Sequence, residues 1–178
     1  MLHDMTPVER AAEFARLAHE SINQRRKYTD EPYIVHPARV AELVASVTDD
    51  ENMLCAAWLH DVVEDTPVTL AQIHEEFGAD VAELVRGLTK VSTRSDGDRA
   101  SRVAIDRQDT ASTDSRTQTI KLADMIANLD GITKQDPRFA RNYLKEKEQL
   151  LAAMPAGDAT LRSRLEQIIN FENSQLRQ

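Results

Sequence analysis

The chain has 178 residues, of which 41% are hydrophobic and 29% are charged, the composition of an ordinary soluble protein. This length is most simply one domain, which we expect to span residues 1–178 and to bury a core without disulfides. The net charge of −8 argues against nucleic acids and anionic membranes as partners, because both would repel the protein. A small anionic ligand held by a local basic patch or by a metal ion is compatible with this charge.

Three further features predict a cytoplasmic protein. The single cysteine, Cys55, cannot form an internal disulfide and lies in an apolar helical segment, which fits a reducing compartment. The first ten residues, MLHDMTPVER, lack the apolar run of a secretory signal. No apolar run approaches the length needed to cross a membrane.

Helix signals recur along the first half of the chain. Thr6 and Glu9 form a capping box with Pro at the first helical position, and Pro37 is expected to begin a second helix. A third helix should begin after Asp50, run through the segment ENMLCAAWLHDVV and end at Thr66-Pro67, because the residue before proline disfavours the α conformation. Two shorter helices should follow, with expected caps at these pairs: Thr69 with Gln72, and Asp80 with Glu83.

The second half begins with a polar segment, residues 92–115, which we interpret as a mobile loop containing one short helix around residues 99–107. The segment RTQTIKLADMIANL that follows is again helical. Asp136-Pro137 should begin a helix that closes at residues 155–157, and Asp158 should begin the last one. The predicted fold is all-α, a compact bundle of about seven to nine helices.

The segment WLHDVVEDT, residues 58–66, places four ionisable groups directly after an apolar run. On a continuous helix His60 and Glu64 would share one face, and Asp61 and Asp65 another. An imidazole beside a carboxylate suits a divalent transition metal. A His-Asp pair alone, however, is more often a solvated helix end, because the dipeptide carries no ligand spacing.

Two other residues favour a metal site. His36 stands directly before Pro37, at the N-terminus of a predicted helix. Asp124 lies in the apolar segment LADMI, where a charge without a partner would be costly to bury. Taken alone, Asp124 is more often a solvated helix carboxylate.

In this order, His36, His60-Asp61 and Asp124 resemble the H…HD…D signature of the HD superfamily of metal-dependent phosphohydrolases. The segments RRKYTDEPYIVHP, LHDVVEDT and IKLADMIANL are similar to the (p)ppGpp hydrolase domain of stringent-response enzymes, and most similar to the small stand-alone alarmone hydrolases. The resemblance covers roughly residues 10–150. It implies a helical bundle of the HD-domain type that removes the 3′-pyrophosphate from an alarmone and releases pyrophosphate and a nucleoside 5′-di- or triphosphate.

The resemblance also implies roles for individual residues. The four signature residues would bind one divalent ion, Mn²⁺ in most relatives. Glu64 and Asp65 would act on the attacking water and on the proton that goes to the leaving 3′-oxygen. Arg26 and Lys27 would contact the nucleobase, and Asn128 the ribose or base. Tyr143 would lie near the phosphates. The 5′-phosphates would be bound by three basic residues, Lys121, Arg99 and Arg102. For the basic residues and Tyr143, a helix-end, surface or core role is the alternative.

The sequence departs from the family pattern at two places close to the base pocket. Asp130-Gly131 stands where long relatives have Arg-Thr, and the segment KYTDEPY replaces a shorter Ser-Gly version. These differences leave open an adenine alarmone such as (p)ppApp, or NADPH, as the substrate. We expect no synthetase domain after residue 150.

Three other functions compete with alarmone hydrolysis. They are a general HD phosphohydrolase acting on nucleoside monophosphates or cyclic nucleotides, a non-catalytic alarmone sensor, and a helical interaction module. Glu64 and Asp65 argue against the first, because a bare HD enzyme does not need them. The presence of every ligand and acid argues against the sensor, and Asp124 in its apolar segment argues against the interaction module. The sequence predicts no oligomeric state.

Overall fold

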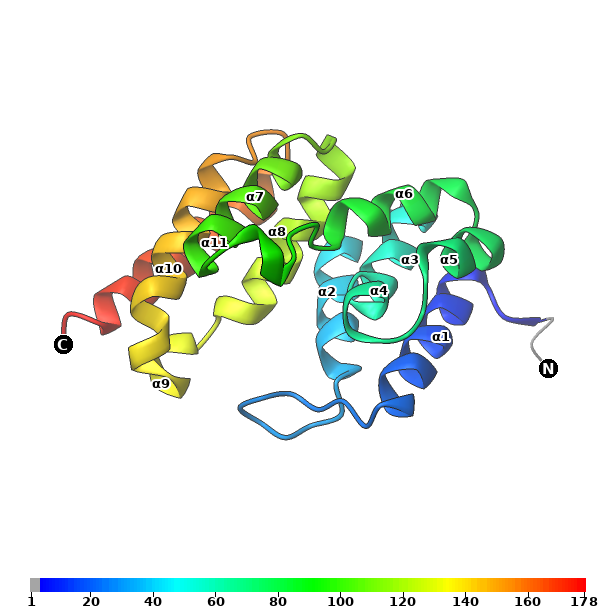
Figure 1. Cartoon of the computed structure of the whole chain (residues 1–178), viewed down its shortest axis with the longest axis horizontal. Helices are drawn as coiled ribbons and strands as arrows, with labels where there is room; N and C mark the ends of the chain where they lie inside the picture. The colour runs from blue at the N-terminus through cyan, green and yellow to red at the C-terminus, as the bar shows by residue number, and fades with distance from the viewer. Residues whose placement is uncertain (1–3) are drawn as a thin grey trace. The chain divides into compact units, whose positions relative to one another are not determined.

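A computed structural model describes residues 4–178 and divides into two compact units, which meet in sequence between Thr89 and Lys90 (Figure 1). Within the described residues every element is helical apart from one isolated bridge between Arg25 and Pro32, and this confirms the all-α prediction. The single-domain assignment stays a prediction. The first three residues of the stretch examined for a signal peptide lie outside the described part. No helix within residues 4–178 is long and apolar enough to cross a membrane.

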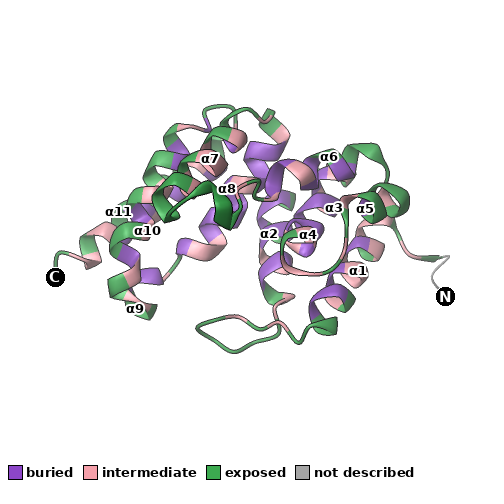
Figure 2. Ribbon diagram, in the orientation of Figure 1, coloured by how far each residue is buried: buried purple, intermediate pink, exposed green. Residues whose placement is uncertain are grey.

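The first unit is built around one apolar helix, α3. This helix packs against α1, α2 and α6, and its residues Cys55, Ala56, Ala57 and Leu59 are buried (Figure 2). Its small side chains let the neighbouring helices approach closely. The helices of this unit are α1 (Pro7–Ser21), α2 (Val35–Ala45), α3 (Glu51–Leu59), α4 (Val62–Asp65), α5 (Leu70–Phe77) and α6 (Ala79–Leu88).

Three helix starts in this unit follow the sequence, at Thr6, Asp50 and Thr69, and two do not. The capping boxes at Thr6 and Thr69 form as predicted. Helix α2, however, begins at Val35, two residues before Pro37. Helix α6 begins directly after Gly78, so Asp80 is not its cap; the Asp80 carboxylate instead accepts a hydrogen bond from Asn52 Nδ2 at 2.7 Å.

The second unit is built around α8, which packs against α10 and α11. Figure 2 shows buried residues along α8, from Thr117 to Leu129. The elements of this unit are the short 3₁₀ helix η2 (Arg94–Asp96), α7 (Arg99–Ala111), α8 (Ser115–Leu129), α9 (Ile132–Gln135), α10 (Pro137–Ala152) and α11 (Ala159–Gln175).

The segment predicted as a mobile loop is more ordered than its composition indicates. Helix α7 has 13 residues, begins after the N-cap Asp98 and continues past Arg107 to Ala111. The Asp106 carboxylate accepts hydrogen bonds from the backbone N–H groups of Val91 and Ser92 at 3.1 and 2.9 Å. The predicted helix around residues 99–107 is thus confirmed and is longer than expected, and one carboxylate within the segment ties down the stretch that precedes it.

Polar side chains of α8 fix the turn between α10 and α11. Gln118 Oε1 accepts the Ala156 N–H, and Thr119 Oγ1 accepts the Asp158 N–H, both at 3.0 Å. These bonds draw the turn so close to α8 that a Cβ at Gly157 would lie 2.5 Å from Leu122 Cδ1. A larger residue at this position would require the Leu122 side chain to move.

A buried carboxylate holds the short helix α9. Glu172 on α11 is 1% exposed and accepts the backbone N–H groups of Gly131 and Thr133 at 2.8 and 2.9 Å. Gly131 has a φ of 80°, in the left-handed region, where glycine carries no steric penalty. The Gly131 and Thr133 N–H groups belong to the start of α9, so Glu172 satisfies donors that the helix itself leaves open.

We expect Glu172→Ala to lower the free energy of unfolding by about 2–4 kcal/mol, because buried charge-assisted hydrogen bonds are lost and their donors are left without a partner. Glu166→Ala is the matched control, since Glu166 is an exposed glutamate on the same helix. Urea unfolding measures both variants. Equal stability of the two would contradict a structural role for Glu172.

Candidate functional site

The helix predicted to run through His60 and Asp61 is interrupted at these two residues. Helix α3 ends at Leu59, and α4 begins at Val62. The His60 ring lies against the end of α3, where its Nδ1 is 2.7 Å from the carbonyl oxygen of Ala57. A side chain thus bonds to a carbonyl of the last helical turn. The prediction of one continuous helix, with shared faces for His60/Glu64 and Asp61/Asp65, was wrong for this reason.

The same bond fixes the tautomer of His60. A carbonyl oxygen can only accept, so Nδ1 carries a proton, and in the neutral ring Nε2 then presents a lone pair. This lone pair lies 3.2 Å from His36 Nε2 and 3.0 Å from Asp61 Oδ2. His36 Nε2 in turn lies 3.5 Å from the same carboxylate oxygen. Two imidazole nitrogens and one carboxylate oxygen therefore converge on one point.

Tyr33 fixes the carboxylate of this group. Its hydroxyl donates to Asp61 Oδ2 at 2.6 Å, and its ring lies between those of His19 and His36, with centroids 4.7 and 5.6 Å away. Our sequence interpretation did not single out Tyr33. Its place three residues before His36, in the segment EPYIVHP, was the available signal.

These donors fit a divalent metal ion. The ligand atoms of His36, His60 and Asp61 all lie within 4.8 Å of one another. Both imidazoles are almost fully buried, and the Asp61 side chain is 14% exposed, so the atoms face a site shielded from water. Two nitrogens and a carboxylate oxygen form a ligand set that suits transition ions better than Ca²⁺ or Mg²⁺.

The predicted acid pair lies on the single turn α4, directly after these ligands. Glu64 is exposed, whereas Asp65 is half-buried and accepts a hydrogen bond from Gln24 Nε2 at 3.0 Å. Gln24 thus fixes one oxygen of the Asp65 carboxylate. A carboxylate near a metal centre can accept a proton from water.

The basic residues before α2 lie in a loop that Arg25 closes through hydrogen bonds to the side chain and the carbonyl of Asp30. The Arg26 guanidinium lies 5.7 Å from the Tyr33 ring centroid, and the Lys27 ammonium lies 5.0 Å from that of Tyr28. Both distances permit cation–π contact. The structure places Arg26 beside the same tyrosine that contacts Asp61.

In the second unit Asp124 is 6% exposed and accepts hydrogen bonds from Lys121 Nζ and Asn128 Nδ2, both at 2.9 Å. The three residues lie one turn apart along one face of α8. The structure thus brings together three of the predicted site residues. It also shows that Lys121 and Asn128 are partners of the Asp124 carboxylate, which the sequence places in an apolar helical segment.

Helix α10 adds a tyrosine and a lysine beside this group. Burial, with the nearby charge of Asp124, raises the pKa of Tyr143 to about 12, so its hydroxyl stays protonated near neutral pH. Burial, with the nearby charge of Lys121, lowers the pKa of Lys147 to about 8. The Lys147 ammonium lies 4.9 Å from the Tyr143 ring centroid. Sequence interpretation missed Lys147, although it stands one helical turn after Tyr143.

The two arginines of α7 differ in their surroundings. The Arg99 guanidinium donates two hydrogen bonds to the Glu146 carboxylate at 2.9 and 2.8 Å and lies 5.7 Å from the Phe139 ring centroid. The Arg102 side chain is half-buried, and its Nε lacks a hydrogen-bond partner among the described residues. Their predicted role at the 5′-phosphates stays a prediction.

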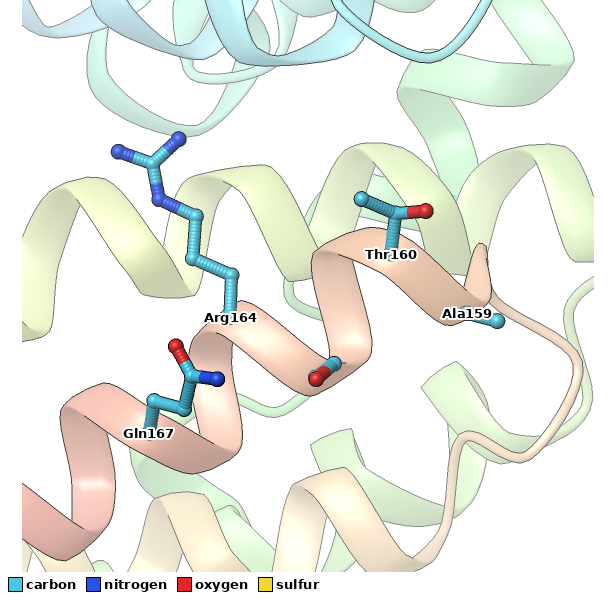
Figure 3. A pocket seen from close by; sticks show the side chains of 5 residues that line it. Ala159, Thr160, Arg164 and Gln167 are labelled. Carbon is cyan, nitrogen blue, oxygen red and sulfur yellow. The ribbon is translucent and has the colours of Figure 1, made fainter.

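A separate hollow lies along α11 (Figure 3). The residues that line it are Ala159, Thr160, Ser163, Arg164 and Gln167. None of these side chains is a carboxylate or an imidazole. The hollow therefore offers neither a set of metal ligands nor a general base.

Comparisons with known proteins place this geometry in context. The family model described as "HD domain" matches residues 11–157. The probable guanosine-3′,5′-bis(diphosphate) 3′-pyrophosphohydrolase of Synechocystis sp. is 34% identical over 138 residues, which are 74% of this chain and 18% of that protein. The guanosine-3′,5′-bis(diphosphate) 3′-pyrophosphohydrolase of Haemophilus influenzae is 39% identical over 141 residues, 74% of this chain and 20% of that protein. The chain thus spans about a fifth of the length of these curated relatives.

Two solved structures resemble the chain. A structure described as "A metazoan ortholog of SpoT hydrolyzes ppGpp and plays a role in starvation responses" is 28% identical, with a TM-score of 0.84 and coverage of 94% of this chain and 96% of that one. The protein lmo0812 from Listeria monocytogenes is 21% identical, with a TM-score of 0.65 and coverage of 78% and 99%, and it supports the fold alone. The family model matches residues 11–157, which are well over half of this chain, and the chain therefore belongs to the HD domain family.

Proposed function

We propose that this chain is a metal-dependent hydrolase that removes the 3′-pyrophosphate from a guanosine alarmone, (p)ppGpp. The observation that carries the proposal is the convergence of His60 Nε2, His36 Nε2 and Asp61 Oδ2, followed directly by the acid pair Glu64-Asp65. Two curated relatives are named guanosine-3′,5′-bis(diphosphate) 3′-pyrophosphohydrolases, and the metazoan SpoT ortholog is described as hydrolysing ppGpp.

We assign the metal to His36, His60 and Asp61, with Asp124 as the fourth ligand, and we propose Mn²⁺ as the ion. The family resemblance supports Asp124 and Mn²⁺, and the nitrogen-and-oxygen ligand set supports a transition ion. When bound, the ion would lower the pKa of a water molecule and polarise a phosphate oxygen. Tyr33 keeps the Asp61 carboxylate oriented through its 2.6 Å hydrogen bond.

Glu64 and Asp65 act on the water and on the leaving group. One of these carboxylates takes a proton from the water. The oxygen of the water then bonds to the phosphorus that is attached to the ribose 3′-oxygen. The bond between this phosphorus and the 3′-oxygen breaks, and the proton is delivered to the 3′-oxygen. The products are pyrophosphate and a nucleoside 5′-di- or triphosphate with a free 3′-hydroxyl. We assign the orientation of the water to Asp65, whose carboxylate Gln24 holds.

The polyanionic substrate needs cations, because the chain carries a net charge of −8. We assign phosphate contacts to Lys121, Lys147 and Tyr143, whose ammonium and hydroxyl groups lie on neighbouring faces of α8 and α10. Arg99 is paired with Glu146, so it would have to exchange a carboxylate for a phosphate to bind substrate. Arg102 is the other proposed contact from α7.

For the nucleoside we assign Arg26 and Lys27 to the base and Asn128 to the ribose or base. An arginine beside a tyrosine can stack on a nucleobase. The loop that carries Arg26 and Lys27 differs from the family pattern, so (p)ppApp and NADPH are the alternatives to test. A hydrolysis assay with Mn²⁺ across ppGpp, ppApp, NADPH and deoxynucleoside triphosphates, with products separated by anion exchange, distinguishes them. Release of pyrophosphate from none of these nucleotides would overturn the proposal.

We further propose that the protein works in the cytoplasm. The single cysteine, Cys55, supports this location. Burial raises the pKa of its thiol to about 11, which suits a cysteine that stays reduced and unreactive.

Replacing a proposed ligand should remove the metal. We expect His60→Ala and Asp124→Asn to retain far less than one Mn²⁺ per chain after dialysis, because each loses a ligand from a small set. His74→Ala is the control, since His74 is an exposed histidine on α5. Elemental analysis of the dialysed proteins measures the metal directly. Full occupancy in Asp124→Asn would remove Asp124 from the ligand set.

The acids should affect turnover without affecting the metal. We expect Glu64→Gln and Asp65→Asn to lower kcat by about 10²–10⁴-fold, the usual contribution of a general acid or base. Metal content and thermal stability should stay those of the unmodified protein. Glu76→Gln, at an exposed glutamate on α5, serves as the control. Loss of the metal in either acid variant would instead make that acid a ligand.

We expect Lys147 to lower the stability of the fold and to strengthen the binding of the phosphorylated substrate. We expect Lys147→Met to raise KM about tenfold or more with kcat nearly unchanged, because a contact to the phosphates is lost. The same variant should be more stable at pH 7, by on the order of 1–3 kcal/mol, since it removes a desolvated cation beside Lys121. Lys145→Met, at an exposed lysine of the same helix, should change neither quantity.

The difference in free energy of unfolding between Lys147→Met and the unmodified protein should become smaller as pH rises. The pKa of Lys147 is lowered to about 8 in the fold from an unfolded value of 10.5, so the charged form costs stability throughout the range below pH 8. As pH rises from about 8 to 10.5 the folded lysine is neutral while the unfolded one is still charged, and this cost disappears. The advantage of Lys147→Met should therefore shrink across this window. Thermal unfolding of both proteins at pH 7 and pH 9.5 measures it.

A further inference from the structure

The end of helix α1 holds a buried histidine that the proposed mechanism does not use. His19 lies in the last turn of α1 and is 1% exposed. Its Nδ1 is 2.7 Å from Gln24 Oε1, and its Nε2 is buried without a hydrogen-bond partner among the described residues. Burial lowers the pKa of His19 below its ordinary value, so the ring is neutral near neutral pH.

The orientation of the Gln24 amide follows from its other contact. Gln24 Nε2 lies 3.0 Å from Asp65 Oδ2, and a carboxylate oxygen can only accept, so the NH₂ group faces Asp65. The amide oxygen must then face His19 and accept its Nδ1 proton. A directed chain of donors therefore runs from the His19 ring through the Gln24 amide to the Asp65 carboxylate.

The backbone around Gln24 is fixed independently of this chain. The Gln24 N–H donates to the His19 carbonyl at 3.0 Å, and the Gln24 carbonyl accepts the Tyr33 N–H at 3.1 Å. Asn23, in the left-handed region with a φ of 50°, makes the reversal that brings Gln24 back beside His19. The side chain of Gln24 is not needed to close this turn, and both of its polar atoms serve the His19–Asp65 connection.

We propose that Gln24 is a positioning residue for the hydrolytic reaction, which holds the Asp65 carboxylate in its working orientation and is itself held by the Nδ1 proton of His19. This inference rests on the proposed role of Asp65. It assigns to the segment after α1 a function in catalysis that needs no contact with substrate. The arrangement parallels the hydroxyl of Tyr33, which orients Asp61 from the same segment.

The kinetic test separates positioning from a structural role. We expect Gln24→Leu to lower kcat about 10–100-fold, the usual cost of losing a partner that orients a site residue, with KM and Mn²⁺ content unchanged. In an Asp65→Asn background the same change should alter kcat by less than about twofold, because the group that Gln24 orients no longer acts. Additive losses in the double variant would overturn the proposal. Gln108→Leu, at an exposed glutamine of α7, is the control.

A rescue at His19 tests the first link of the chain. The amide NH₂ of asparagine can replace the Nδ1–H of histidine but not its Nε2, so His19→Asn should keep most of the activity. His19→Phe keeps a ring but removes the donor, and it should lose about as much kcat as Gln24→Leu. Equal activity of the two His19 variants would overturn the role of the Nδ1 proton. The Gln24 variants keep the proposal testable if His19→Phe does not fold.

A measurement without substrate separates this inference from the proposed function. We expect ¹⁵N NMR of the wild-type protein to show a neutral His19 ring protonated at Nδ1, and Asp65→Asn to shift the side-chain amide signal of Gln24. A proton on Nε2, or an amide signal insensitive to Asp65, would overturn the chain of donors whatever the enzyme hydrolyses. A wild-type protein that releases no pyrophosphate, with these NMR results intact, would instead overturn the proposed function alone.

Discussion

The hydrogen bond from His60 Nδ1 to the Ala57 carbonyl is the interaction on which the rest of the candidate site depends. It joins a ligand side chain to the end of the apolar helix α3, so the ring is held by the core of the first unit and not by its own flexible bonds. In the neutral ring it sets the tautomer, which leaves Nε2 to face the proposed metal site. The break in the helix that accompanies it turns Asp61 toward the same point and places the acid pair on a separate turn.

Much of the fold could be predicted from local signals. The caps at Thr6, Thr69, Asp136 and Asp158 work through side chains within three residues of the helix start, so the sequence contains all the information needed. The proposed metal ligands and the proposed acids could be singled out for a different reason. Ionisable residues at the end of an apolar helix or inside one have few physical explanations, and the order of the motifs restricts them further.

What could not be predicted depends on contacts distant in sequence or on competition between nearby groups. Asp106 ties down residues 91–92 from 14 residues away, and no periodicity in that polar segment reveals this. The helix break at His60 accompanies a bond from its own side chain to the Ala57 carbonyl. In a continuous helix that carbonyl would accept a backbone N–H, so the sequence pattern does not reveal the competing bond. Lys147 was missed because a lysine on an amphipathic helix is ordinarily well solvated, and only the packing of α10 beside α8 shows that this one is half-buried.

The crowding of ammonium groups around Lys147 links ligand binding to the folding equilibrium. Any anion that neutralises Lys147 and Lys121 binds the native state alone, so it draws the population toward the folded form by mass action. The second unit should therefore be least rigid when no phosphate is present and tighten as the site fills. Inorganic phosphate, a fragment of the proposed substrate, would act as a weak chemical chaperone for this half of the chain. If the proposed substrate is the natural ligand, its scarcity would then also lower the population of the folded protein.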